Sequence, residues 1–271
     1  MMTFGVKAVI FDWAGTMVDF GCMAPVRALC DVFAAAGVPI SEAEARADMG
    51  KAKRDHVAAL LGAPAIAARW HAARGAAPAP ADIEAIYAQV EPAMIEAAKA
   101  AADLIPGAAE SHAALRALGV KIGSGTGYTP AMMAAIRARA AQQGYDPAVV
   151  ICAGDTPSGR PAPLMTWAAL IALDVWPARV AVKIDDAPVG IAEGRHAGCW
   201  TIGIAASGNE VGLSRSNLAA LDPAARADRI ARARAALLAA GADYVIDDVS
   251  QVLPVIHAIA ARIDAGETPG G

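Results

Sequence analysis

The chain has 271 residues, a formal net charge of −4 and 56% hydrophobic residues, which predicts one large domain or two modest ones around a substantial core. The mild negative charge argues against partners such as nucleic acid or an anionic membrane surface, because both require a basic patch. No uncharged apolar run reaches the length that crosses a bilayer, and the chain enters a strand directly instead of a secretory signal. Four widely spaced cysteines without a CxxC pair are typical of reduced thiols, so we expect a cytoplasmic protein without a zinc site.

The first predicted element is a short buried strand, the apolar run AVIF at residues 8–11, which stops at Asp12. Small or turn-forming residues follow it. In an open α/β sheet, ligands bind outside the carboxyl ends of the strands, so Asp12 stands where a catalytic group is expected. The alternative is that Asp12 only caps the next turn or helix.

The next segment, residues 24–101, is predicted to be almost entirely helical. Pro25 opens a helix that Gly37 would close, and Ser41 followed by Glu44 has the spacing of a capping box. Roughly 75 residues pass without a credible strand. This segment is therefore expected to be a helical insertion directly after the first strand.

Beyond Pro106-Gly107 the pattern changes to strands alternating with helices, which predicts a mainly parallel sheet with right-handed crossovers. The expected strands are 120–127, 148–154, 180–186, 199–205 and 244–247. We therefore predict an α/β core from residues 1–20 and 102–271, with a helical cap domain at 21–101. The helix-rich segment 206–240 has no evident role in this scheme.

Polar residues stand at the ends of several predicted strands, and in a parallel sheet they would gather at one edge. They are Asp12, the Ser124–Thr126 loop, Arg160 in the turn SGRP, and the pair Asp185-Asp186. The set suits phosphoryl chemistry. It offers a carboxylate nucleophile, a hydroxyl and a cation for phosphate oxygens, and a further acid for Mg²⁺, which two carboxylates and a backbone carbonyl can hold.

These residues resemble the haloacid dehalogenase superfamily, with its D-x-x-x-T opening, Ser/Thr loop, basic residue and acidic last motif. Within the superfamily the chain is similar to the phosphonoacetaldehyde hydrolase (phosphonatase) family over nearly its whole length. The likeness is carried by FDWAGTMVDFGCMAP (11–25), MGKAKRDHV (49–57), KIGSGTGYT (121–129), GRPAP (159–163) and EGRHAGCWTIG (193–203). The resemblance implies a Rossmann-like core with an inserted cap, a small phosphonate substrate, Mg²⁺, and a homodimer formed through the cap.

The resemblance also implies roles for individual residues. Asp12 would attack phosphorus to form an aspartyl-phosphate, and Lys53 would condense with the aldehyde as a Schiff base. Relatives that cleave phosphate esters carry a general acid where this chain has Ala14. Its absence argues against a plain phosphomonoesterase, because a general acid accelerates such reactions by ~10²–10⁴. The alternative for Lys53 is an exposed charge on a helix surface.

The remaining implied roles concern binding and proton transfer. His56 lies three residues after Lys53 on one helix face and would move protons around the imine, unless it is a surface histidine. The metal would be held by Asp12, Ala14 (through its carbonyl) and Asp186. The substrate and its phosphoryl group would be bound by Thr126, Gly127, Arg160, Cys22, Met49 and Tyr128. Core packing is the alternative for Cys22 and Met49.

The last motif departs from the family pattern, which has Gly-Asp-Thr and a second acid four residues after the first. Here Asp186 takes the first acidic place, Gly190 stands where the second acid belongs, Asp185 replaces the glycine and Ala187 the threonine. Loss of a carboxylate in or beside a metal site typically costs ~10–100-fold in affinity or activity. Adjacent strand residues face opposite ways, so Asp185 is interpreted as a solvated loop residue that does not compensate.

Three interpretations follow from the sequence. The leading one is an active phosphonatase with a weakened or rearranged metal site. The second is a metal-independent dehalogenase, in which an aspartate displaces halide from carbon and Lys53 has no role. The third is a non-catalytic relative that binds a phosphonate or a partner protein without turnover. Dependence on Mg²⁺ separates the first two, and binding without product would mark the third.

Overall fold

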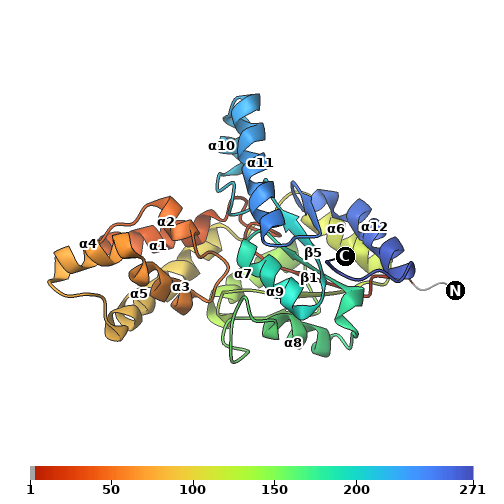
Figure 1. Ribbon diagram of the computed structural model, residues 1–271, viewed down its shortest axis with the longest axis horizontal. Coiled ribbons are helices and arrows are strands. Elements are labelled where there is room, and N and C mark those ends of the chain that lie inside the picture. The colour runs from red at the N-terminus through yellow and green to blue at the C-terminus, as the bar shows by residue number, and fades with distance from the viewer. Residues whose placement is uncertain (1–3, 271) are drawn as a thin grey trace.

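The computed structural model describes residues 4–270, which contain one six-stranded parallel sheet in the order β3-β2-β1-β4-β5-β6 (Figure 1). The strands are β1 (Ala8–Phe11), β2 (Lys121–Gly125), β3 (Val149–Ile151), β4 (Ala181–Asp185), β5 (Trp200–Ile204) and β6 (Tyr244–Ile246). Each lies within a segment that the sequence predicted to be a strand. The predicted α/β class with a parallel sheet is therefore confirmed.

Of the helices between β1 and β2, the first five lie in the segment predicted to be helical, and they extend to one side of the sheet (Figure 1). They are α1 (Met23–Ala35), α2 (Glu42–Arg46), α3 (Lys53–Gly62), α4 (Pro64–Arg74) and α5 (Pro80–Ala100), and we call them the insertion. The predicted capping box is present: the Ser41 hydroxyl accepts the Glu44 N–H at 3.2 Å, and the Glu44 carboxylate accepts the Ser41 N–H at 2.8 Å. Gly37 takes a left-handed conformation (φ +75°) just after α1 ends, as a helix-terminating glycine does.

Helices cover both faces of the sheet, as a parallel sheet requires. They are α6 (Ala108–Ala117), α7 (Pro130–Gln142), α8 (Leu164–Ala172), α9 (Pro188–Ala197), α10 (Arg215–Ala220), α11 (Pro223–Ala239) and α12 (Val252–Asp264), with short 3₁₀ helices at Ala178–Val180 and Val249–Gln251. Segment 206–240 supplies α10 and α11, which stand away from the rest of the core in Figure 1. Leu237 of α11 packs over Gly203 of β5, so this segment partly covers the sheet.

One continuous apolar core joins the sheet to the insertion. Val9 and Phe11 of β1 belong to the same buried cluster as Leu29 of α1 and Val90 of α5, and all four side chains are fully buried. The insertion is thus anchored by burial of apolar surface, the main favourable contribution to folding. Among the described residues, none of the helices combines the length and the apolar character that a bilayer crossing requires.

The insertion should lose stability when its own core is truncated. Leu29→Ala removes a fully buried side chain where α1 packs against α5, and we expect the free energy of unfolding to fall by about 2–5 kcal/mol. Chemical denaturation followed by circular dichroism measures this loss. Arg27→Ala, at an exposed position on the same helix, is the control and should change stability by less than about 0.5 kcal/mol. Equal effects of the two variants would contradict the packing described here.

Candidate active site

The carboxyl ends of three neighbouring strands bring the predicted polar residues together. Phe11 pairs with Ser124 of β2 on one side and with Ile184 of β4 on the other, so the residues after these positions lie level with one another. Asp12 follows directly, Thr126 and Asp186 each stand two residues beyond the paired position, and all three are buried. The convergence of these groups at one edge of the sheet, expected from the sequence, is observed.

A small cavity of about 20 Å³ lies where this edge meets the insertion. Its lining includes nearly every residue that the resemblance singled out: Asp12, Ala14, Cys22, Met49, Lys53, Thr126, Gly127, Tyr128, Arg160 and Asp186. A space of this size holds about one water molecule. The insertion is therefore closed over the strand ends, and a substrate of several heavy atoms needs it to move.

Lys53 is the first residue of α3 and is only 3% exposed, so it is not the solvated surface lysine of the alternative interpretation. Its Nζ lies 3.6 Å from the sulfur of Met49 and 5.3 Å from the ring centroid of Tyr128. Burial among these weakly polar groups lowers the pKa of Lys53 to about 8. At neutral pH, about a tenth of this amine is in the uncharged, nucleophilic form.

Asp12 is held by the backbone and by Arg160. Its N–H donates to the carbonyl of Ile184 at 2.9 Å, and its Oδ1 accepts from Nη2 of Arg160 at 2.7 Å. Burial, and next the charge of Asp185, raise the pKa of Asp12 to about 6, while Arg160 opposes the rise. The carboxylate is therefore ionised above this pH and available as a nucleophile.

Arg160 connects three parts of the molecule. In addition to Asp12, its Nη2 donates to the carbonyl of Gly125 at 2.8 Å, and its Nη1 donates to the carbonyl of Gly50 in the insertion at 3.3 Å. Its Nε donates to Glu193 of α9 at 2.9 Å. The guanidinium thus fixes Asp12, the end of β2 and the insertion relative to one another.

The prediction that Asp185 is a solvated loop residue is wrong. It ends β4, is completely buried, and its Oδ2 lies 2.8 Å from Nζ of Lys183 and 3.4 Å from Nη2 of Arg160. Its Oδ1 accepts the N–H of Ala187 at 3.1 Å. The argument from alternation failed because it applies within a strand. Asp186 already belongs to the turn, so both carboxylates can approach Asp12.

Two charged residues of this site, Lys183 and Glu193, were not assigned a role from the sequence. Both side chains are completely buried, and Glu193 also accepts from the backbone and hydroxyl of Thr166 at 3.1 and 2.9 Å. A charged residue within an apolar strand or on a buried helix face indicates a buried ion pair, because such residues are rarely buried without a partner. This signal could have identified both residues from the sequence. Asn209 was also missed, and its N–H donates to Oδ2 of Asp186 at 2.7 Å.

Some predicted residues are placed differently from the expectation. His56 is fully buried but outside the cavity lining, and within the described residues both of its ring nitrogens lack a hydrogen-bond partner. Burial lowers its pKa to about 3, so the ring is neutral. The hydroxyl oxygen of Ser124 accepts a hydrogen bond from the indole N–H of Trp13 at 2.7 Å. The space beside Gly127 is filled by the insertion, since a Cβ there would lie 2.5 Å from the carbonyl oxygen of Lys51.

The donor set of the site suits a hard divalent cation. Carboxylate oxygens of Asp12, Asp185 and Asp186 lie within 4.8 Å of one another. Hard cations such as Mg²⁺ prefer oxygen ligands of this kind. The backbone is shaped to admit Asp186, because a Cβ at Gly15 would lie 2.2 Å from its Oδ2. The residues present therefore fit the metal that the resemblance implies.

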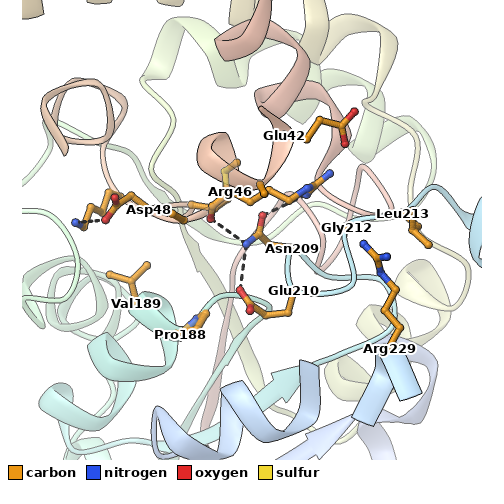
Figure 2. A pocket seen from close by; sticks show the side chains of 14 residues that line it. Glu42, Arg46, Asp48, Pro188, Val189, Asn209, Glu210, Gly212, Leu213 and Arg229 are labelled. Carbon is orange, nitrogen blue, oxygen red and sulfur yellow. Dashed lines mark hydrogen bonds and ion pairs between the residues drawn. The ribbon is translucent and has the colours of Figure 1, made fainter. Parts of the chain in front are cut away.

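A larger cleft of about 660 Å³ adjoins the closed cavity, and Met49 lines both. Figure 2 shows it between the insertion, which contributes Arg46 and Asp48, and core residues that include Asn209 and Arg229. The amide of Asn209 accepts from Arg46 at 3.3 Å and donates to its backbone carbonyl at 3.2 Å. Since the backbone of Asn209 also binds Asp186, this contact links the insertion to the reactive carboxylates.

Comparisons with known proteins agree with this geometry. Residues 6–198 match the family model of the haloacid dehalogenase-like hydrolases. The phosphonoacetaldehyde hydrolases of Paraburkholderia phytofirmans and Paraburkholderia xenovorans are each 47% identical over 97% of this chain and 99% of their own. The crystal structure of a phosphonoacetaldehyde hydrolase-like protein from Oleispira antarctica superimposes with a TM-score of 0.97 at 40% identity, over 98% of this chain and 97% of that one. The chain therefore belongs to the haloacid dehalogenase-like hydrolases and, among them, to the phosphonoacetaldehyde hydrolase family.

Proposed function

We propose that the protein hydrolyses the C–P bond of phosphonoacetaldehyde, giving acetaldehyde and phosphate. The observation that carries this proposal is the presence of a buried amine and a buried carboxylate, Lys53 and Asp12, on the same small cavity. The names of the related hydrolases support the same reaction. The reaction needs both groups. Direct cleavage of a C–P bond would expel an unstabilised carbanion, so the amine must first activate the carbon side before the carboxylate attacks phosphorus.

The proposed reaction begins with the neutral amine of Lys53, which attacks the aldehyde carbon; the adduct takes up one proton from solvent and loses water to form an iminium. Asp12 then attacks phosphorus, and the electron pair of the C–P bond moves onto the iminium to give an enamine. Protonation and hydrolysis of the enamine release acetaldehyde and regenerate Lys53. Water cleaves the aspartyl-phosphate to phosphate and regenerates Asp12. No step of this route expels an unstabilised carbanion.

The absence of a carboxylate at position 14 supports this route. Ala14 lines the cavity where an ester-cleaving relative would carry its general acid. A leaving group that departs as an enamine needs no proton at that moment, so the missing acid costs nothing. The proton that the enamine later accepts is assigned to His56. Because His56 lies outside the cavity lining, a water molecule would have to relay that proton.

We further propose that Mg²⁺ is held by Asp12, Asp186 and the carbonyl of Ala14. When bound, it offsets the negative charge of the phosphoryl oxygens, so that an anionic carboxylate can approach an anionic phosphorus. Arg160, Thr126 and Gly127 would bind the same oxygens. Cys22, Met49 and Tyr128 would surround the aldehyde end and keep water away from the imine.

The insertion is proposed to act as a cap domain at residues 21–101, closing on a core of residues 1–20 and 102–271. Support comes from the cavity of about 20 Å³, which is too small for the substrate, and from the larger cleft beside it. Opening along that cleft would admit substrate, and closing would exclude water. We also propose that the protein is cytoplasmic, in line with its four free cysteines. The proposed assembly is a homodimer joined through the cap.

Lys53→Arg should abolish Schiff-base chemistry while keeping a positive charge. We expect turnover of phosphonoacetaldehyde to fall at least about a hundredfold. Borohydride in the presence of substrate should label the parent protein and leave the variant unlabelled, as mass spectrometry would show. The labelling rate should rise with pH through about 8, where half of the amine is neutral, and level off about one pH unit higher. Undiminished labelling of the variant would rule out Lys53 as the site.

Gly127→Ala should prevent full closure of the cap. The new methyl group would lie 2.5 Å from the carbonyl oxygen of Lys51, so the insertion must retreat. A shift of about 1 Å between reacting groups lowers turnover by about 10–100-fold, and a steady-state assay measures it. Gly159→Ala is the control, because its methyl group would meet Ala52 at an ordinary 3.6 Å. The closure proposal fails if both variants retain the parent rate.

A further inference from the structure

The chain enters the insertion once and leaves it once, and the two connections lie side by side. Val18, before the insertion, forms an antiparallel bridge with Leu104, which follows it. Next to this bridge, the N–H of Ile105 donates to the carbonyl of Met17 at 2.8 Å. The insertion can therefore rotate about this pair of segments as about a hinge.

The first connection has an unusual backbone at residues 19–22, which we call the hinge segment. Asp19, Gly21 and Cys22 are all in the left-handed region, with φ of 54°, 88° and 53°. Residues other than glycine rarely adopt this conformation, and strained residues of this kind occur preferentially at active sites and switch regions. The core holds the segment in place: the N–H of Gly21 donates to the carbonyl of Ser207 at 2.7 Å.

Arg46, the last residue of α2, joins the hinge segment to the core. Its Nη1 donates to the carbonyl of Gly21 at 2.8 Å and to Oδ1 of Asn209 at 3.3 Å, and Nδ2 of Asn209 donates back to the carbonyl of Arg46 at 3.2 Å. The core leaves room for the guanidinium, since a Cβ at Gly212 would lie 2.7 Å from its Nε. Asn209 is only 3% exposed, so its amide depends on these partners and has little access to water.

The contact spans the larger cleft beside the active site. Figure 2 shows Arg46 on the wall formed by the insertion and Asn209 on the wall formed by the core. Opening along this cleft separates the two walls and breaks both hydrogen bonds between these residues. The chain runs on from Arg46 through Met49 to Lys53, and the last two line the closed cavity. Movement of Arg46 away from the core would therefore take part of the cavity lining with it.

We propose that Arg46 and Asn209 form a latch that holds the insertion closed over the active site. Arg46 is then a positioning residue, which keeps Lys53 facing Asp12 and touches neither the substrate nor the reacting atoms. The inference rests on closure of the insertion in the proposed function. It adds the contact that stabilises the closed state and predicts that loss of either side chain opens the cavity to solvent.

The experiment uses Cys22 as a reporter of opening. Cys22 lines the closed cavity, is 3% exposed, and burial raises the pKa of its thiol well above the usual value. Iodoacetamide reacts with an accessible thiolate, so it modifies Cys22 only when the insertion opens. Mass spectrometry of the peptides gives the rate of alkylation at each cysteine. Cys199, which is fully buried in the core, reports unfolding in the same sample.

We expect Arg46→Met and Asn209→Ala each to raise the alkylation rate of Cys22 by at least about fivefold, because each removes the hydrogen bonds of the latch. The double variant should react no faster than the faster single variant, because the two changes remove one and the same contact. The rate at Cys199 should stay at the parent value in all three. Unchanged rates at Cys22, or effects that multiply in the double variant, would overturn the latch.

Arg69→Met is the matched control. Its Nη2 donates to Glu44 of α2 at 2.7 Å, so this change also removes an arginine hydrogen bond to α2, but one that lies entirely within the insertion. The rate at Cys22 should stay within about twofold of the parent, below the effect of one lost hydrogen bond. An increase as large as that of Arg46→Met would show that any loosening of the insertion has the same effect, and would also overturn the latch.

The possible failures can be told apart because alkylation requires no turnover. If the parent hydrolyses no phosphonoacetaldehyde, the proposed function fails and the rates at Cys22 still decide the latch. If the parent is active and the rates at Cys22 do not change, the latch alone is wrong. Circular dichroism checks folding. Should Arg46→Met fail to fold, Asn209→Ala decides the matter, because it keeps the backbone N–H that binds Asp186.

Discussion

The site depends on one buried cation, Arg160. A guanidinium without access to water costs several kcal/mol unless good hydrogen bonds replace its hydration. Arg160 meets this condition through carboxylates just after β1, at the end of β4 and on α9, and through carbonyls at the end of β2 and in the insertion. The same contacts that satisfy the arginine therefore hold the nucleophile and the insertion in register. Burial also explains why Asp12 keeps a raised pKa despite this partner.

The two lysines of the site show how partners decide reactivity. Lys183 is buried against the carboxylates of Asp185 and Glu193, which suits a structural charge. Lys53 is equally removed from water, but its near neighbours are a thioether and an aromatic ring. Burial without a close carboxylate favours the neutral amine, so the pKa of Lys53 falls to about 8. A nucleophilic amine at neutral pH follows from where the chain places its carboxylates.

Much of the fold could be predicted from the sequence because it depends on local patterns. The strands are short apolar runs bounded by turns, and the capping box at Ser41 and the terminating Gly37 are read from a few adjacent residues. The convergence of Asp12, Thr126 and Asp186 follows from strand order alone. Asp185 was misinterpreted because its position depends on Gly190 of α9, a contact between elements that no local pattern contains. The same holds for Glu193 and Asn209, which reach the site from other elements.

The most direct test of this chemistry is to measure acetaldehyde and phosphate released from phosphonoacetaldehyde over a wide range of Mg²⁺ concentrations. We predict equal amounts of the two products, with a rate that rises and saturates as Mg²⁺ increases. Release of neither product at any Mg²⁺ concentration would contradict the proposed hydrolysis. Halide release from a haloacid, or phosphonate binding without turnover, would then identify which of the two alternative functions the protein has.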